Sequence, residues 1–499
     1  MFFRSLRGAL KSNQRIVFVA ATVGSSVTAW SGSTQSQTPP RSLCQAAASV
    51  AAAAESTVET PSAPSETFYT PNQVAERNGV DHPDTWVSFR GKVYDITDFM
   101  SQHPGGSIIH DAAGGPLENY WAYWAYHTLL DKPMIFLKRY EIGISIENDE
   151  SESLDDIRQQ LYEGDPNRQN SGTNGQIPLC YQPWCSETTP SKLTTMYTPN
   201  YAFYVRNHAP VPDLDADDHS ITLIVAADST SSQLPNSVPK QFKTTLNLED
   251  LTERYPTVTI PSILQCAGNR AADLMAVAPT AFAGTPFAVI QTGLMGNAEW
   301  KGVRLSQVLL DAFPFLQDLT DTEMDQMHVE FEGADQYRAS TTLRRILDPA
   351  SDALLCTEMN GEPLPRDHGY PVRVFLPGVA GCRNVKWLHS VRLLAAESDS
   401  CFQKTYYLGP NGEAIQEMPM QAFVSSKKKL KSRTCTGSAG DCAVQWKVTG
   451  IAWGGGSGVG IDRVQVSTDG GETWLAVQNV QVGPARDASN GRGYNGKRS

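Results

Sequence analysis

The sequence predicts an α+β protein built from several domains. Its 499 residues suffice for roughly three domains of ~150 residues each. Residues 176–397 alternate short strand-like runs with loops and a few helical stretches, which indicates a mixed α+β domain. Residues 398–499 alternate polar and apolar positions between Gly-rich turns, which is typical of a β-sandwich. A smaller unit of short strands and turns, residues 66–145, precedes both.

Residues 1–65 predict a targeting segment followed by a disordered spacer. The stretch up to Arg15 contains four basic residues, and no acid occurs before Glu55, which is typical of a mitochondrial presequence. The mostly apolar run 16–30 is shorter than the ~20 residues of a membrane span, so we expect no stable span. A basic stretch followed by a short apolar one indicates the mitochondrial intermembrane space, with a secretory signal as the alternative. Residues 31–65 are rich in Ser, Ala, Thr and Pro, which indicates a disordered spacer.

The charge balance bears on the choice of partner. The formal net charge is −12 at pH 7, and residues 1–60 carry five basic residues and two acids, so the remainder carries −15. Such a protein repels nucleic acid and attracts a basic partner through long-range steering. The alternative is that the negative charge only keeps the protein soluble.

The nine cysteines do not form a dense disulfide pattern. Cys180 lies close to Cys185 in sequence and Cys435 lies close to Cys442, but neither pair has zinc-type spacing with a partner pair. Cys266, in "LQCAGNR", has three open interpretations: a buried core thiol, half of a disulfide, or a reactive or metal-ligating thiolate.

Residues 66–145 contain two histidines placed to bind a haem. His103 is followed by Pro104 and two glycines, which end a helix and present the imidazole from a tight turn. His127 lies 24 residues further on, after the aromatic run "YWAYWAY". Two imidazoles in an apolar aromatic pocket fill both axial positions of a haem iron, which favours electron transfer over oxygen chemistry.

The motifs "HPGG" and "GKVYDITDF", together with this histidine spacing, resemble cytochrome b5 over the whole unit. The resemblance implies a b-type haem with His103 and His127 as iron ligands. We expect His110, only seven residues from His103, to be solvated and not to bind iron.

Residues 146–175 predict a flexible acidic linker. Eight acids and one Arg lie between Glu147 and Asp165, and a Gly-, Asn- and Ser-rich tract follows. A coil of ~30 residues spans about 30 Å, enough for the first unit to swing between a docking site and a partner. A passive spacer is the alternative.

The central domain sets cations, imidazoles and one thiol in apolar segments rich in Gly and Pro. This combination predicts a buried polyanionic ligand, because guanidinium groups bind phosphate or sulfate oxygens in bidentate fashion. A soft thiolate suits a polarizable transition metal, and an adjacent cation such as Arg270 lowers a thiol pKa. The candidate residues are Arg206, His208, Cys266, His368, Arg373, Arg383 and Lys386.

The segments "YVRNHAPVP", "LQCAGNR" and "RDHGYPVRVFLPGVAGCRNVKW", in this order, resemble the sulfite oxidase family over about 400 residues. The resemblance implies a molybdenum–molybdopterin cofactor with Cys266 as the protein ligand to molybdenum. It also implies that Arg206 faces the substrate anion and that Tyr407 is an active-site tyrosine, with Tyr406 as the alternative. The residues that would hold the pterin and its phosphate are His208, Asp335, His368, Arg373 and Lys386. For Arg373 and Lys386, an ordinary ion pair is the alternative role.

One departure from the family pattern concerns substrate binding. The family usually has two arginines after "CAGN", but here Arg270 is followed by Ala271. We expect either Arg206 to carry more of the anion binding or another cation to compensate.

The C-terminal segment resembles the immunoglobulin-like dimerisation domain of the same family. We expect the basic run 427–433 to lie in a loop. After Val477 the resemblance stops, so we expect an incomplete sandwich, and a homodimer only if the domain is complete.

The resemblance as a whole implies oxidation of sulfite to sulfate at a molybdenum–pterin centre, with electrons passing singly through haem b to cytochrome c. One alternative is a nitrate reductase-like molybdoenzyme, which would place the haem domain after the molybdenum domain and add a flavin-binding region. The other is a non-catalytic haem electron carrier with a degenerate molybdenum domain, which Ala271 would suit.

Overall fold

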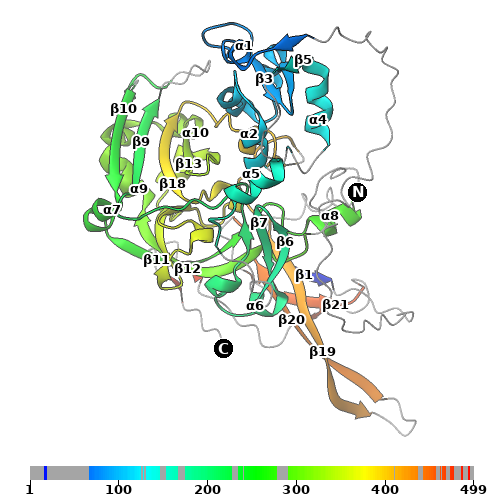
Figure 1. Cartoon of the computed structure of the whole chain (residues 1–499). Coiled ribbons are helices and arrows are strands. Elements are labelled where there is room, and N and C mark those ends of the chain that lie inside the picture. Colours follow the sequence, from blue (N-terminus) through cyan, green and yellow to red (C-terminus); the bar gives the residue numbers. More distant parts are fainter. Residues whose placement is uncertain are drawn as a thin grey trace.

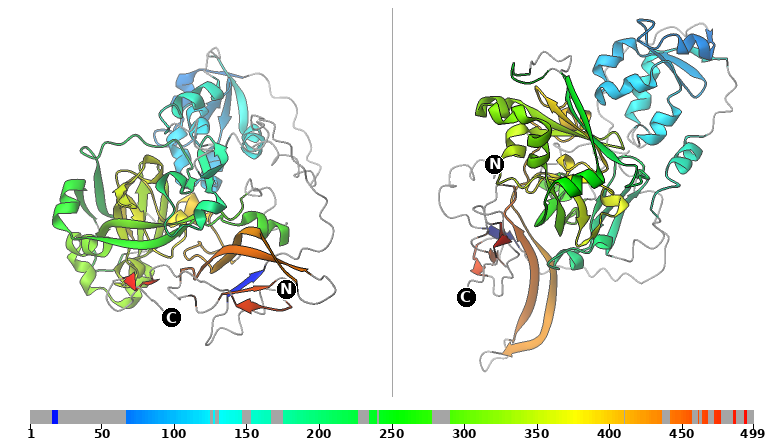
Figure 2. Two further views of the ribbon diagram at one scale, coloured as in Figure 1. Left: turned by 90° about the horizontal axis from the view of Figure 1, so that it is seen from below. Right: turned by 90° about the vertical axis from the view of Figure 1, so that its left-hand side faces the viewer.

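The computed structural model describes three folded units and part of a linker. It covers residues 16–19, 67–124, 127, 131–146, 153–166, 175–226, 234–239, 241–277, 290–409, 411–435, 442–456, 461, 464–467, 472–476, 485–486 and 493–494. Figure 1 shows the first unit above a large central domain, with a long C-terminal hairpin extending below it, and Figure 2 shows the same units from two further sides. Within the ranges described, no helix has the length and apolar character that crossing a membrane requires.

The first unit is a four-stranded sheet covered by short helices. Its strand order is β2–β5–β4–β3, with β2 at Phe68–Tyr69, β5 at Glu141–Ser145, β4 at Lys92–Asp95 and β3 at Trp86–Phe89. The helical segments are α1 (Pro71–Ala75), η4 (Thr97–Gln102), η5 (Gly106–Ala112), α2 (Glu118–Tyr123) and α4 (Lys132–Leu137). Helix α1 begins at Thr70, which forms a capping box with Gln73. Val87 and Phe89 from the sheet pack with Trp121 from α2, and this core fixes the turns that carry the two histidines.

The predicted linker, residues 146–175, contains a helix. Helix α5 (Leu154–Leu161) begins after Ser153, whose side chain accepts a hydrogen bond from a backbone amide in the first turn, and α5 packs against α2. The next residue, Tyr162, is buried. The prediction of a flexible coil is therefore wrong for residues 153–166. This acidic segment also contains apolar side chains, and its helix packs against α2.

The central domain contains two larger sheets and a smaller one. The first sheet has the order β10–β9–β18–β13–β14, in which β9 and β18 run parallel and the other neighbours run antiparallel. Its strands are β9 (Ser220–Ala226), β10 (Gln241–Asn247), β13 (His328–Gly333), β14 (Arg338–Thr342) and β18 (Leu388–Leu394). The second has the order β11–β12–β15–β16, with β17 also paired to β15. Its strands are β11 (Thr257–Gln265), β12 (Met295–Arg304), β15 (Leu354–Met359), β16 (Glu362–Pro363) and β17 (Arg373–Phe375).

The smaller sheet and a set of helices complete this domain. The sheet has the order β6–β7–β8, with β6 at Gln176–Tyr181, β7 at Trp184–Thr188 and β8 at Val205–Arg206. The helices are α6 (Pro190–Leu193), α7 (Leu248–Arg254), α8 (Ala271–Val277), α9 (Leu305–Ala312), α10 (Asp321–Gln326), α11 (Leu343–Leu347) and α12 (Cys401–Lys404).

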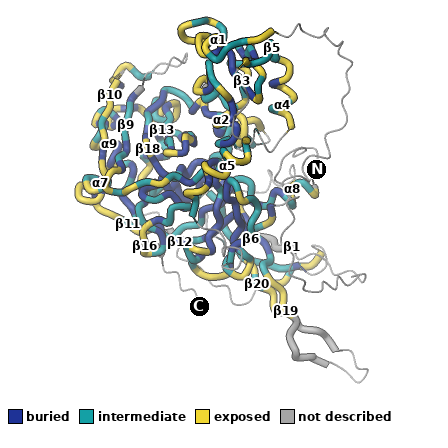
Figure 3. The backbone as a smooth tube through the Cα atoms, viewed as in Figure 1, coloured by how far each residue is buried: buried dark blue, intermediate teal, exposed yellow. Residues whose placement is uncertain are grey.

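Hydrophobic periodicity explains how these elements pack. Strand β9 buries the alternate residues Ile221, Leu223 and Val225, whereas α9 buries Leu305 and Leu309, which lie one helical turn apart. These residues belong to one large core cluster that spans the first sheet and its covering helices. Figure 3 shows the buried interior beneath an exposed outer surface. A rigid core of this kind holds the strand ends and loops that form the functional site.

The C-terminal residues form β structure. Strands β19 (Gln421–Cys435) and β20 (Cys442–Trp453) make an antiparallel hairpin, a three-stranded sheet contains β1 (Ile16–Val19), β21 (Val464–Ser467) and β22 (Leu475–Ala476), and β23 (Ala485–Arg486) pairs with β24 (Gly493–Tyr494). The basic run 427–433 lies inside β19, so the prediction of a loop there is wrong. The sequence pattern did not predict a strand here because the run of lysines lacks the alternation of polar and apolar residues.

The segment predicted to be a presequence also contributes a strand. Strand β1 pairs in parallel with β21, so these four residues are part of a sheet in this structure. The rest of residues 1–65 lies outside the described residues, and the targeting segment and spacer remain predictions there.

Candidate active site

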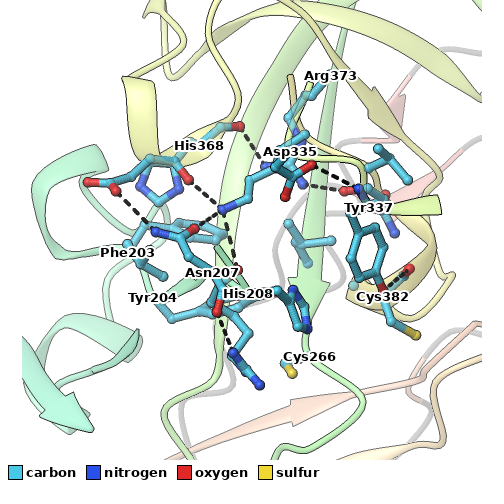
Figure 4. Close-up of a pocket in the computed structure, with 18 of the residues that line it drawn as sticks. Phe203, Tyr204, Asn207, His208, Cys266, Asp335, Tyr337, His368, Arg373 and Cys382 are labelled. Carbon is cyan, nitrogen blue, oxygen red and sulfur yellow. Dashed lines mark hydrogen bonds between the residues drawn. The ribbon is translucent and has the colours of Figure 1, made fainter. Parts of the chain in front are cut away.

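One cavity in the central domain gathers all but one of the site residues predicted for that domain (Figure 4). About 650 Å³ of space within it, part of which is open to solvent, is not filled by protein atoms. The predicted residues that line it are Arg206, His208, Cys266, Asp335, His368, Arg373, Lys386 and Tyr407. They come from the ends of β8, β11 and β13, from the segment around β17, and from the loop after α12. Arg383, the remaining candidate from the sequence, is fully buried and donates hydrogen bonds to the carbonyls of Ile415 and Phe402, which is a structural role.

Cys266 lies in a turn directly after β11. Its thiol is buried and accepts a hydrogen bond from the Gly268 amide at 3.4 Å. A Cβ atom at Gly381 would lie 3.4 Å from the Cα of Cys266, so a glycine there lets a second loop approach the turn closely. Burial raises the pKa of the Cys266 thiol, and the nearby charge of Arg206 opposes that rise.

Arg270, the neighbour of Cys266 in sequence, points elsewhere. Its backbone has φ +65°, and its guanidinium pairs with the Asp273 carboxylate at 2.7 Å. The prediction that Arg270 lowers the thiol pKa is wrong, because Arg206 from β8 supplies the positive charge near Cys266. Ala271, at the start of α8, is buried in an apolar cluster with Leu264 and is not among the residues that line the cavity.

Arg206 is half-buried and lines the cavity. One terminal nitrogen, Nη1, lies 2.5 Å from the carbonyl oxygen of Asn207 and 3.2 Å from the Cys185 sulfur. These contacts hold one end of the guanidinium against β7 and β8. Arg206 thus brings a positive charge to the thiol from a different strand.

Lys386 and Asp335 are charged groups that also line the cavity and influence each other's pKa. The Lys386 ammonium donates hydrogen bonds to the Asn207 side-chain oxygen and to the carbonyls of Arg206 and Asp367. Burial lowers the pKa of Lys386 and raises the pKa of Asp335, since desolvation disfavours the charged form of each. Their mutual attraction partly offsets both effects.

His368 and Arg373 both line the cavity and are joined by a hydrogen bond. Burial lowers the pKa of His368 to about 4 and the pKa of Arg373 to about 10. Arg373 donates hydrogen bonds to the carbonyls of His368 and Asn384 at 2.9 and 3.0 Å. Backbone carbonyls, and not a carboxylate, therefore position this guanidinium beside the cavity.

His208 and Tyr407 form a hydrogen-bonded pair, with His208 Nε2 2.7 Å from the Tyr407 hydroxyl. Burial holds the pKa of His208 well below its usual range, and the charges of Arg206 and Lys386 lower it further. Tyr407 lines the cavity, whereas its neighbour Tyr406 is 39% exposed and does not. The geometry therefore favours Tyr407 over Tyr406 as the tyrosine of this site.

Sequence reasoning missed several lining residues. Asn207 lies between two predicted residues and links β8 to Lys386. Asp367 precedes His368, and Tyr337 follows Asp335 by two positions, with its hydroxyl 2.8 Å from the Cys382 carbonyl. Proximity in sequence to a candidate was the available signal for all three. Tyr204, two positions before Arg206, had the same signal.

The cavity suits a large anion that carries a soft metal. Its described lining has three basic side chains, Arg206, Arg373 and Lys386, against two carboxylates, Asp335 and Asp367. Desolvation penalises these buried cations, and a bound polyanion would offset that penalty. With one thiol among them, the residues present fit a phosphorylated, metal-bearing pterin in both charge and donor type.

The first unit holds the second predicted site. The rings of His103 and His127 are parallel to within 9°, and their centroids are 6.1 Å apart. A metal between two imidazoles needs about 6 Å, because each bond is about 2 Å and each nitrogen lies about 1 Å from its ring centre. Burial lowers the pKa of His103 and lowers the pKa of His127 to about 4, which favours the neutral imidazole that a metal ligand needs.

The surroundings of these histidines also suit a haem. The Trp121 ring lies 5.3 Å from His127, and the Phe99 ring lies 5.8 Å from His103. A Cβ atom at Gly105 would lie 2.5 Å from the His103 ring, so this glycine leaves room for the imidazole. Residue 110 is exposed, in agreement with its expected solvation.

The two sites are joined by contacts between the units. Tyr123 donates a hydrogen bond to the Asp335 carbonyl at 3.3 Å, and the Trp124 ring lies 6.1 Å from Phe402. Phe402 in turn packs against Tyr337 and His208, with ring centroids 4.2 and 5.0 Å apart. Aromatic side chains thus lead from the cavity wall to the backbone beside His127.

Comparison with known proteins assigns each unit to a family. Residues 70–144 match the Cytochrome b5-like Heme/Steroid binding domain, residues 208–402 match the Oxidoreductase molybdopterin binding domain, and residues 412–494 match the Mo-co oxidoreductase dimerisation domain. The chain is 36% identical to "Sulfite oxidase, mitochondrial" of Homo sapiens over 430 residues, which cover 82% of this chain and 71% of that protein. The chain belongs to the sulfite oxidase family. "Sulfite oxidase" of Gallus gallus is also 36% identical, over 436 residues that cover 83% of this chain and 85% of that one.

Membership of the sulfite oxidase family confirms the predicted fold class, an α+β protein with a haem-binding unit, a molybdopterin domain and a C-terminal β domain. The likeness to the dimerisation domain continues to residue 494, so the prediction that it stops after Val477 is wrong. "Nitrate reductase [NADH] 1" of Oryza sativa subsp. japonica is 30% identical over 303 residues, which cover 56% of this chain and 30% of that protein. The match to nitrate reductase therefore covers a smaller share of this chain than the matches to sulfite oxidases do.

Proposed function

We propose that this chain oxidises sulfite to sulfate and passes the electrons one at a time, through haem b, to cytochrome c. The observation that carries the proposal is a single cavity in which a buried thiol lies among three basic side chains. Such a cavity attracts both an anionic cofactor and an anionic substrate. The family of the chain supports this choice of substrate over nitrate, as does the position of the haem unit before the molybdopterin domain.

Some residues of the cavity would bind the cofactor, and others would face the substrate. We propose that Cys266 ligates molybdenum, and that the pterin and its phosphate are held by His208, Asp335, His368, Arg373 and Lys386. When bound, the molybdenum–pterin group supplies a two-electron oxidation. Arg206 and Tyr407 would face the substrate.

The protein's own part in the reaction is to bind, orient and shield the anion. Arg206 has one terminal nitrogen held by Asn207 and Cys185, which fixes the direction of the rest of the guanidinium. His208 is neutral and orients the Tyr407 hydroxyl, which can donate to a substrate oxygen. Burial of the site excludes most water, so each charge-assisted contact is stronger than at the surface.

The proposed electron route runs from the cavity through Phe402 and Trp124 to the haem ligand His127. His127 is tied to the Trp124 carbonyl, with 3.2 Å between its Nδ1 and that oxygen. The contact between the units supports transfer within one molecule in the arrangement of Figure 1. Cytochrome c is the acceptor that we propose, because the chain's net charge of −12 attracts a basic partner.

The remaining proposals concern location, assembly and boundaries. We propose the mitochondrial intermembrane space, supported by the basic N-terminal segment and by mitochondrial relatives. A homodimer is supported by the match to a dimerisation domain, and sedimentation of the purified chain tests it. As domain boundaries we retain 66–145, 146–175, 176–397 and 398–499.

Metal analysis combined with an assay tests the proposed function. The purified full chain should contain about one molybdenum and one haem iron, and sulfite should reduce cytochrome c in its presence. Molybdenum and haem without sulfite-dependent reduction would reject sulfite as the substrate. Haem without molybdenum, in a host that makes the pterin, would favour the non-catalytic electron carrier, for which the departure at Ala271 is the supporting observation.

A further inference from the structure

We propose that Cys180 and Cys185 are a site of reversible disulfide formation, and that this disulfide loosens the substrate-facing Arg206. The chemical site itself is independent of the proposed function, whereas its effect on the substrate rests on that function. Neither thiol lines the cavity, and Cys180 has no role in the reaction described above.

Three side chains form one row across the small sheet. In the antiparallel ladder of β6 and β7, Cys180 is directly opposite Cys185, and in the ladder of β7 and β8, Cys185 is directly opposite Arg206. Residues that are directly opposite in a ladder project from the same face of the sheet. The row therefore runs from a thiol on β6, through a thiol on β7, to the guanidinium on β8.

The spacing within this row suits a disulfide. Directly opposed residues in an antiparallel pair have Cα atoms about 4.5–5.5 Å apart. Disulfides need Cα atoms about 4.4–6.8 Å apart, so the bond requires rotation of side chains and little movement of the backbone. Both residues are thiols in the structure.

Exposure makes Cys180 the thiol that would react first. Cys180 is half-buried beside Tyr181, which is 56% exposed, whereas Cys185 is buried. The oxidant that we propose is a low-molecular-weight disulfide, such as oxidised glutathione. The Cys180 thiolate attacks one sulfur of the oxidant and releases one thiol, and the Cys185 thiolate then attacks the mixed disulfide and releases the second. Two protein thiols and one small disulfide thus become one protein disulfide and two small thiols.

The consequence follows from what Cys185 does while it is reduced. Its sulfur lies 3.2 Å from Arg206 Nη1, and its thiol donates to the Asn207 carbonyl at 3.4 Å. A bond to Cys180 turns the sulfur away from β8 and removes both contacts. Arg206 then keeps its hydrogen bond to the Asn207 carbonyl but loses the support from β7, so its guanidinium is held less firmly toward the anion.

Mass mapping of the full chain tests whether the disulfide forms. After equilibration with oxidised glutathione, the tryptic peptide 169–192, whose two cysteines are Cys180 and Cys185, should become about 2 Da lighter than after treatment with a reducing agent. Cys180→Ser is the matched control and should give no such loss. The pair Cys435 and Cys442 is also directly opposed, in β19 and β20, so only the mass of peptide 169–192 counts. A peptide that stays reduced, or that carries only glutathione, would overturn the proposal.

A binding measurement tests the effect on Arg206 without relying on turnover. Sulfate serves as the probe, and its affinity for the oxidised chain should be about fivefold to tenfold lower than for the reduced chain. KM for sulfite should rise by a similar factor, and Cys180→Ser should show neither change. Equal sulfate affinity with the disulfide formed would overturn the regulatory part. A disulfide that weakens sulfate binding in a chain that never oxidises sulfite would uphold this inference and reject the proposed function instead.

Discussion

The haem site and the cavity of the central domain are built in opposite ways. Both predicted iron ligands lie within 25 residues, in a unit of about 80 residues, and one tight turn and one helix position them. The cavity draws its residues from segments as far apart as Arg206 and Tyr407. The haem site is thus a local structure that rests on a small core, whereas the cavity exists only when several strands and loops meet.

This difference teaches where each site is vulnerable. A change in the haem unit should leave the central domain folded, because that domain has its own large core. A change at the cavity acts on a network of buried charges, in which removing one group leaves others unpaired. Variants can therefore separate the two sites, as follows from the largest expected effect to the smallest.

Cys266→Ser should lower sulfite oxidation by roughly 10³-fold or more, because a hydroxyl is a poor ligand where a soft thiolate is needed. Haem content should stay normal, because the haem unit is separate. Cys382→Ser is the matched control, since it changes another buried thiol of the same cavity and should keep most activity. Steady-state assays and haem absorbance would measure this, and equal loss in both variants would contradict the assignment of Cys266.

His103→Ala or His127→Ala should abolish the low-spin haem spectrum and, with it, cytochrome c reduction. Molybdenum content should be unchanged, because the cavity shares no residue with the haem site. His110→Ala is the control, since this exposed residue is seven positions from His103 and should leave the spectrum intact. A low-spin spectrum that survives in both alanine variants would reject the ligand pair.

Arg206→Gln should raise KM for sulfite and lower kcat/KM by about 10²-fold, which corresponds to a charge-assisted contact of ~3 kcal/mol. Arg270→Gln is the informative comparison, because Arg270 is nearer to Cys266 in sequence but pairs with Asp273. We expect it to change KM by less than about threefold, since exposed ion pairs contribute little. The reverse order of effects would contradict the assignment of Arg206 to the substrate.

Trp124→Leu should slow the transfer of electrons from the cavity to the haem by about tenfold, which corresponds to roughly 1.4 kcal/mol of barrier. Phe402→Leu, on the other side of the contact, should have a similar effect, and the double variant should be little worse than either one. Stopped-flow measurement of haem reduction after mixing with sulfite gives the rate. Fully additive effects would show that the two rings act separately.

Acidification should destabilise the central domain through its buried histidines. Burial lowers the pKa of His368 to about 4, below the ordinary 6.5, so between these values only the unfolded chain takes up the proton. His368 alone should therefore lower the free energy of unfolding by about 1.4 kcal/mol between pH 7 and pH 5.5, and the depressed pKa of His208 acts in the same direction. Calorimetry of the haem-loaded chain at both pH values would measure this, with His368→Gln as the variant that loses part of the dependence.

The sequence by itself determined the local features of this protein. A few neighbouring residues are enough to recognise the turn after His103, the spacing to His127 and the thiol in "CAGNR". Each of these features depends on residues that are close together in the sequence. The family resemblance added the residues that meet in the cavity, and the structure brings every one of them there. The haem unit and the alternating strands of the central domain were predictable for the same reason, since hydrophobic periodicity is a local property.

Only the tertiary structure decided which charges, thiols and rings meet. Arg206, 60 residues before Cys266 in sequence, approaches the thiol, while the adjacent Arg270 turns away. The row that joins Cys180 and Cys185 to Arg206 depends on the register of two ladders, and the contact of Trp124 with Phe402 depends on how two units pack. The helix of the acidic linker likewise depends on a surface for it to pack on. Contacts between distant segments are set by the packing of the whole fold, because burial and strand register, not sequence distance, decide which side chains become neighbours.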